Sequence, residues 1–202
     1  MRDHEAIINK IFKLLCGFKP QPEALREHLR GVLTGKFYPH RKVLFKSGTV
    51  VKDLLFVSDG FVVCYGFNDL GDGQVVGIAA RNSIVFGRSF TTQSPSIFEW
   101  VCLPGTYLLS MDSETLLDTY ARFPGTEELA RIVLADAVEK ELLTRISLNR
   151  DAELVVESFY HRFREFKFSG RMLVDADIAS YLMIAESTLR NVRAKLSREG
   201  RF

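Results

Sequence analysis

The segment DADIASYLMIAESTLRNVRAKL, Asp175–Leu196, contains two short runs with helical spacing of apolar residues and almost nothing between them. Asp175 is a good N-cap for the first run. The positions that we predict to face inward are Ile178, Ala179, Leu182, Leu189, Val192 and Leu196. Two amphipathic helices joined by a turn of three or four residues predict a helix-turn-helix, in which a small residue such as Ala179 allows the second helix to approach the first.

The charges of the second helix point outward. Residues 185–202 hold five basic side chains and two acidic ones, namely Arg190, Arg193, Lys195, Arg198 and Arg201 against Glu186 and Glu199. This excess fits a helix laid against phosphates, although a solvated helix hairpin rich in arginine remains the alternative. The turn position that usually holds glycine in such units is Met183, so we expect a strained or altered turn.

The composition of the chain excludes several classes of protein. Its 202 residues have a net charge of +2, too small to identify a partner. No apolar run approaches the roughly 18–20 residues that span a bilayer, and the N-terminus predicts an amphipathic helix rather than a secretion signal. The three cysteines lack metal-ligand spacing, so we expect reduced, partly buried thiols in a cytoplasmic protein. With neither a nucleophile–base pair nor a phosphate loop, an enzyme is not expected.

Upstream of the helix-turn-helix the hydrophobic period changes twice. Residues 1–35 predict two helices on either side of Pro20–Pro22. From about residue 37 to Met111, short apolar runs alternate with turn residues, which predicts a compact antiparallel barrel or roll. Asp59-Gly60 and Asp72-Gly73 are expected to supply the positive φ values of tight hairpins.

Helical spacing returns after Pro124-Gly125. Residues 126–148 predict a helix of about six turns with Thr126 as its N-cap. Its apolar positions form more than one stripe, so it needs two partners, for which we expect the roll and a second copy of the chain. Packing within one subunit is the alternative. A further helix is predicted over 151–166.

This order of elements resembles the CRP/FNR family of bacterial transcription regulators. The resembling segments are SGTVVKDLLFVSDGFVVCY with Gly48 and Gly60, RNSIVFG, and DIASYLMIAESTLRNVRAKL, whose terse form is most like the Bacteroidetes branch. The resemblance implies an α+β protein with three parts: an N-terminal double-stranded β-helix (β-roll) effector domain over 1–125, a long connector and dimerisation helix over 126–148, and a winged-helix-like helix-turn-helix DNA-binding domain over 149–202. Because the sequence ends at Phe202, we expect the C-terminal wing to be absent.

The resemblance also implies a cytoplasmic homodimer that binds double-stranded DNA and RNA polymerase. Matched position by position, the DNA-binding residues are Glu186, Ser187, Thr188, Arg190, Asn191, Arg193 and Lys195. Glutamate can accept from cytosine and asparagine can pair with adenine, so Glu186, Ser187 and Asn191 are expected at base edges. The other four suit phosphates, and Arg190 could also reach guanine. The family usually has arginine where Asn191 stands, so we expect a different operator.

The effector cassette departs from that of the cyclic-nucleotide-binding members, which it otherwise resembles. Those members have glutamate after FG and then Arg-Ser or Arg-Thr about ten residues later, whereas this chain has FGRSFTTQSPSIFEWV. The positions concerned are Phe86, Gly87, Arg88, Ser89, Phe90, Glu99 and Trp100. With the phosphate partner replaced and Glu99 added, we predict no tight binding of cAMP or cGMP and no cofactor. Arg88 could pair with Glu99, or hold a different ligand such as a carboxylate.

Two functions therefore remain open at the level of sequence. The first is a dimeric, sequence-specific DNA-binding regulator. The alternative is a small-molecule-binding or scaffolding module whose degenerate helix-turn-helix no longer binds DNA, an alternative motivated by Met183 and the missing wing.

Overall fold

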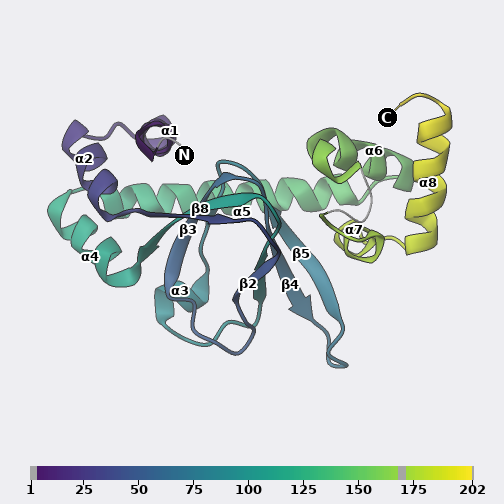
Figure 1. Ribbon diagram of the computed structural model, residues 1–202, viewed down its shortest axis with the longest axis horizontal. Coiled ribbons are helices and arrows are strands. Elements are labelled where there is room, and N and C mark those ends of the chain that lie inside the picture. Colours follow the sequence, from purple (N-terminus) through teal and green to yellow (C-terminus); the bar gives the residue numbers. More distant parts are fainter. Residues whose placement is uncertain (1–3, 168–171, 202) are drawn as a thin grey trace. The chain divides into compact units, whose positions relative to one another are not determined.

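The computed structural model describes residues 4–167 and 172–201 (Figure 1). The chain forms two compact units, one made of residues up to Val63 with Ile78–Ala137, and one made of Cys64–Gly77 with residues from Val138 onward. The first unit contains α1 (His4–Phe18), α2 (Glu23–Val32), β1 (Thr34–Tyr38), β2 (Lys42–Phe45), β3 (Asp53–Asp59), β6 (Ile84–Val85), α3 (Arg88–Thr92), β7 (Glu99–Cys102), β8 (Thr106–Asp112) and α4 (Ser113–Arg122). The second contains α6 (Ala152–Arg162), the 3₁₀ helix η1 (Arg164–Lys167), α7 (Asp175–Tyr181) and α8 (Glu186–Arg198). Three elements run through both units: β4 (Val62–Phe67), β5 (Gly73–Ala79) and α5 (Thr126–Leu148).

The first unit is built on a four-stranded sheet with the order β1-β8-β3-β6, whose three strand pairs are all antiparallel. Side chains alternate between the two faces of a strand. On β3, Leu55 and Val57 therefore point to one face, where they pack with Leu108. Phe56 points to the opposite face and packs against Met111 and the N-terminal helices. The unit thus has two hydrophobic cores, one inside the roll and one outside it.

The outer core explains why α1 and α2 form. Both helices present an apolar stripe, and Ile8, Ile11, Leu25 and Leu29 are buried together against the sheet. Pro20 and Pro22 fall in the connection, where proline interrupts helical hydrogen bonding. The two predicted N-terminal helices are confirmed.

The hairpin turns were predicted only in part. Gly60 has φ 80°, and a Cβ at this position would lie 2.7 Å from the Cα of Thr106, so glycine is needed for both reasons. In the β4–β5 turn the positive φ belongs to Gly71, at 84°, and not to the predicted Asp72-Gly73 pair. That turn is closed by the backbone of Asn68, which leaves Gly73 to begin β5 in an ordinary conformation.

Two helices of the first unit, α3 and α4, were not predicted. The signal for α4 is Asp112, whose carboxylate accepts a hydrogen bond from the Thr115 N–H at 2.8 Å, and this bond lowers the pKa of Asp112. Thr126 was predicted to be the N-cap of α5, but it is the first residue of the helix. The Thr126 hydroxyl donates to the carbonyl oxygen of Phe123 at 2.7 Å.

Helix α5 has the predicted bounds. Only its first turns are buried, at Thr126, Leu129 and Val133. Farther along, the exposed fractions of five large apolar side chains run from 48% to 66%, at Leu134, Val138, Leu142, Leu143 and Ile146. None of the described helices is both long enough and apolar enough to cross a membrane.

The α+β class, an antiparallel sheet core with a C-terminal helix-turn-helix, is confirmed. The two compact units nevertheless differ from the predicted domain limits, because they divide α5 between Ala137 and Val138 and place the β4–β5 hairpin with the C-terminal helices. The division into residues 1–125, 126–148 and 149–202 stays a prediction.

Candidate nucleic-acid interface

Helices α7 and α8 of the second unit form the predicted helix-turn-helix core. Ile178 of α7 and Leu189 and Leu196 of α8 are completely buried, and Leu182 in the turn nearly so. These are the positions that the spacing assigned to the inner face. Their burial leaves the opposite face of α8 exposed.

Among the described residues from Asp175 to Arg198, one residue has a left-handed backbone conformation, and it lies in the turn between the two helices. Met183 has φ 57° and its side chain is 81% exposed. The Met183 N–H donates to the Ser180 carbonyl oxygen at 3.2 Å, and the Ile184 N–H donates to that of Ala179 at 3.1 Å. Backbone closure of this kind commonly ends a helix, normally with glycine at the left-handed position. The predicted turn is present, and a non-glycine residue adopts its unfavourable conformation.

Asp175 does not cap α7 as predicted. It is the first residue of the helix, and no side-chain cap is formed by the preceding residue, Val174. The Asp175 carboxylate instead accepts two hydrogen bonds from the guanidinium of Arg193, at 2.7 and 2.5 Å. The Arg193 hydrogen bonds hold the pKa of Asp175 below its usual range.

Arg193 therefore faces the interior of the motif. Its guanidinium also donates to the hydroxyl of Tyr160 on α6, at 3.3 Å. The side chains of Arg193 and Asp175 are only 21% and 18% exposed. The sequence placed Arg193 among the phosphate contacts, and that role stays a prediction. In the structure its partly buried pair with Asp175 links α8 to α7, and its contact with Tyr160 links α8 to α6.

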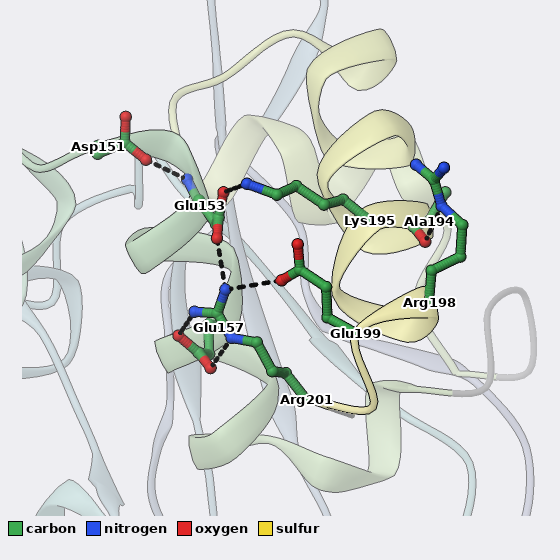
Figure 2. Close-up of polar contacts among 8 residues, drawn as sticks. All are labelled: Asp151, Glu153, Glu157, Ala194, Lys195, Arg198, Glu199 and Arg201. Carbon is green, nitrogen blue, oxygen red and sulfur yellow. Dashed lines mark hydrogen bonds and ion pairs between the residues drawn. The ribbon is translucent and has the colours of Figure 1, made fainter.

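The C-terminal end of α8 is fastened to α6 by a second set of charges, drawn in Figure 2. Lys195 pairs with Glu153, while Arg201 reaches Glu153 at 2.5 Å and Glu157 at 2.5 Å. Glu199 accepts from Arg201 at 3.0 Å. The hydrogen bonds from Lys195 and Arg201 lower the pKa of Glu153. Lys195, another predicted phosphate contact, is thus already paired within the protein.

The exposed front of α8 consists of the N-terminal residues that point away from these contacts. Ser187 and Asn191 are exposed, and Glu186 and Thr188 are half-buried. Arg190 is 60% exposed and pairs with Glu186 one turn earlier. Farther along, Arg198 is exposed and its side chain donates to the carbonyl oxygen of Ala194 at 3.3 Å, as Figure 2 shows. Glu186, Ser187, Arg190 and Asn191 thus form one accessible polar surface.

The β4–β5 hairpin contributes two contacts to α7 that the sequence did not predict. The Tyr65 hydroxyl donates to the Asp177 carboxylate at 2.9 Å. The Val75 N–H donates to the Ser180 hydroxyl at 3.0 Å. Both contacts lie within the second unit and explain why the hairpin belongs to it.

The predicted effector residues lie in the first unit and are not brought into one pocket. Gly87 and Arg88 are exposed, and Arg88 makes no ion pair with Glu99 among the contacts of the described residues. The buried Ser89 hydroxyl accepts from the Val51 N–H at 2.9 Å and donates to Ser94 at 2.5 Å. Trp100 packs on the core inside the roll, whereas Phe86 and Phe90 line a cavity outside it.

The cysteines are consistent with reduced thiols. Cys16, Cys64 and Cys102 are free, and the last two are buried. Burial raises the pKa of the Cys64 thiol to about 12 and that of Cys102 to about 11, so neither is a reactive thiolate. Among the described residues there is no group of three or more His, Cys, Asp or Glu side chains that could hold a metal ion.

The chain is similar to known regulatory proteins over part of its sequence and to solved structures in its fold. No family model matches the chain. The fumarate nitrate reduction regulatory protein of Klebsiella oxytoca is 22% identical over 169 residues, which are 79% of this chain and 67% of that protein.

Solved structures agree on the fold. FixK2 from Bradyrhizobium japonicum superposes with a TM-score of 0.64 at 16% identity, covering 84% of this chain and 86% of the other. A Eubacterium rectale protein assigned to the CRP/FNR family of transcriptional regulators gives a TM-score of 0.66 at 13% identity, covering 91% and 89%. The fold predicted from the resemblance is confirmed, while the Bacteroidetes branch stays a prediction.

Proposed function

We propose that this chain, which shares its fold with CRP/FNR transcription regulators, is a sequence-specific DNA-binding regulator that acts as a homodimer. The observation that carries this proposal is the exposed front of α8. Glu186, Ser187, Arg190 and Asn191 are accessible on a helix whose other face is buried and fastened by ion pairs. A helix held rigidly from behind, with hydrogen-bonding side chains in front, is suited to the major groove.

The charges of the motif support a modest electrostatic contribution to DNA binding. Of the five basic side chains in residues 185–202, Arg193, Lys195 and Arg201 are paired with acids of α6 and α7. Arg190 and Arg198 remain on the exposed side for phosphates or guanine. Each phosphate contact contributes to the salt dependence of affinity, so we expect a shallower slope than the five basic residues suggest.

Dimerisation through α5 is supported by its exposed apolar side chains. Leu134, Val138 and Leu142 recur every four residues along the helix, and all three are about half exposed. Side chains spaced four residues apart form a ridge that can pack into a groove of a second helix. Analytical ultracentrifugation of the full chain should show a dimer, and Val138→Asp with Leu142→Asp should give a monomer.

The regulator is not expected to respond to cyclic nucleotides. The exposed Arg88 stands where the resembling family members have a carboxylate, and the hydroxyl of Ser89 is already engaged by backbone groups. Isothermal titration should show no sub-micromolar binding of cAMP or cGMP. Tight binding of either would refute this part of the proposal.

The DNA proposal is tested by mobility shifts with the chain's own promoter region and with a random duplex of equal length. We expect promoter DNA to be preferred, and binding to weaken steeply with salt. Asn191→Ala should reduce that preference by about 1–3 kcal/mol, the contribution of one base-specific contact, with little loss of non-specific binding. Ser197→Ala, an exposed change on the same helix, is the matched control. Equal affinity for both duplexes at every salt concentration contradicts the proposal.

That same result would favour the alternative, a ligand-binding or scaffolding module with a degenerate helix-turn-helix. The specific observation behind this alternative is the internal pairing of Arg193, Lys195 and Arg201.

A further inference from the structure

A cavity of about 330 Å³ lies in the first unit, on the outer face of the sheet. Its walls come from α1, α2, β3, β6, β8, α4 and the first turns of α5, together with Phe86 and α3. Ligand pockets typically measure about 300–1,000 Å³, so this one is large enough for a small organic molecule. All of its walls belong to the same compact unit.

The alternation of β3 separates this cavity from the inside of the roll. Leu54 and Phe56 line the cavity, whereas Leu55 and Val57 belong to the core on the opposite face. The predicted effector pocket shares only Phe86 and Phe90 with the cavity. The cavity is therefore a separate site, built mainly by elements that the sequence did not connect with ligand binding.

The lining favours an uncharged ligand. Leucine, isoleucine, phenylalanine, valine and methionine supply most of it, and no Asp, Glu, Lys, Arg or His side chain is among the lining residues in the described part of the chain. An anion or cation entering this space would lose its hydration without gaining a partner. A neutral apolar molecule would gain from burying its surface.

Most polar groups of the lining are already engaged. The Thr119 and Thr126 hydroxyls donate to backbone carbonyl oxygens at 2.7 Å each, and the Gln93 amide donates to that of Phe90 at 2.6 Å. The hydroxyls of Tyr120 and Ser113 form no hydrogen bond with any described residue. Burial raises the pKa of Tyr120, so its hydroxyl stays protonated at neutral pH and can donate.

We propose that this cavity binds a neutral, predominantly apolar ligand carrying one hydrogen-bonding group, which the Tyr120 hydroxyl meets. Leu129, Ala130 and Val133 place the first turns of α5 against the ligand. If the chain is the dimeric regulator proposed above, the ligand acts on the same helix that carries the dimer seam. Ligand binding itself does not depend on that function.

The first test uses N-phenyl-1-naphthylamine, a neutral probe whose fluorescence rises in apolar sites, with the full chain and without DNA. We expect a saturable rise with one probe bound per chain. Ala130→Phe fills the cavity from α5 and should weaken probe binding tenfold or more. Ala135→Phe adds the same side chain at an exposed position of the same helix and should leave binding unchanged.

The second test identifies the chemistry by displacing the probe with three matched compounds. In the unmodified chain 1-naphthol should bind more tightly than 1-naphthoate by at least tenfold, because no cation lines the cavity. Tyr120→Phe should weaken 1-naphthol about three- to tenfold, the contribution of one hydrogen bond, and leave naphthalene unchanged. This small change keeps the test valid even if Ala130→Phe does not fold.

The proposal would be overturned by the absence of saturable probe binding, by unchanged binding in folded Ala130→Phe, or by equal loss of 1-naphthol and naphthalene in Tyr120→Phe. Preferential binding of 1-naphthoate would overturn the assignment to neutral ligands. Because the measurements omit DNA, their failure is distinguishable from failure of the regulator proposal.

Discussion

The front and the back of α8 use similar side chains for opposite purposes. On the front, Arg190 is 60% exposed, and among the described residues its ion-pair partners are Glu186 on the same helix and, at 3.8 Å, Asp175. On the back, the guanidinium of Arg193 donates two short hydrogen bonds to the Asp175 carboxylate and one to the Tyr160 hydroxyl. A count of basic residues cannot separate these cases. What separates them is burial: the Arg193 pair is partly buried and links two helices, whereas the Arg190–Glu186 pair lies exposed on one helix.

The largest expected effect concerns the back of the helix. Arg193→Ala leaves the carboxylate of Asp175 partly buried without its partner, and we expect the free energy of unfolding to fall by about 2–4 kcal/mol. Urea denaturation at pH 7 measures this loss. Arg193→Lys keeps the charge but cannot form the two-pronged pair, so its loss should be intermediate.

Arg190→Ala is the matched control on the front of the same helix. It removes an exposed ion pair, and such pairs contribute at most about 1 kcal/mol. If both alanine variants destabilise the chain equally, the distinction between the two faces is wrong.

The pair of Arg193 and Asp175 should also make the stability of the motif depend on pH in acid. Hydrogen bonds from Arg193 lower the pKa of Asp175 in the folded protein. A carboxyl with a lowered folded pKa stabilises the fold above its unfolded pKa of about 3.9, and this stabilisation is lost as the pH falls through the folded value. Between pH 5 and 2, unfolding free energy should therefore fall less steeply in Asp175→Asn than in the unmodified chain.

Asp69→Asn, an exposed change in the β4–β5 turn, should retain the unmodified slope. Some acid sensitivity will persist in Asp175→Asn, because the pKa values of Asp112, Glu128, Glu153 and Glu157 are also lowered. An identical slope in both variants would exclude Asp175 as a source.

The contrast between the two faces also predicts the salt dependence of DNA binding. Arg190→Ala and Arg198→Ala should each reduce the slope of log affinity against log salt by about 1. Lys195→Ala and Arg201→Ala remove cations already paired on α6, so they should leave the slope almost unchanged. Four equal reductions would show that the internal pairs open when DNA binds.

The sequence alone predicted the helices of the motif but not the partners of their charged side chains. The spacing of apolar residues was enough to predict the buried face of α7 and α8 and the bounds of α5, because this spacing depends only on residues within the same helix. The partner of Arg193 lies 18 positions away. An aspartate at a helix start suits both a cap and an ion pair, so local pattern could not decide between the two roles of Asp175.

The missed features of the first unit have similar causes. Helix α4 had a usable signal in Asp112, which is the last residue of strand β8 and also the N-cap of α4. The cavity had none, because it exists only where helices from both ends of the first unit meet one face of the sheet. Likewise, Tyr65 and Asp177 are 112 positions apart and become neighbours only through folding.

The smallest expected effect tests the turn that joins the two faces. Met183 adopts φ 57°, a conformation that costs a residue with a Cβ about 1–2 kcal/mol, and its exposed side chain returns little packing energy. Met183→Gly removes that strain. Glycine also makes the unfolded chain more flexible, which raises the free-energy cost of folding by about 0.5–1 kcal/mol, so we expect a net gain in stability of up to about 1 kcal/mol. Met183→Ala keeps the Cβ and should show no gain. Met183→Val, with a branched Cβ, should lose stability. A gain for alanine equal to that for glycine would assign the effect to the methionine side chain and contradict backbone strain as its cause.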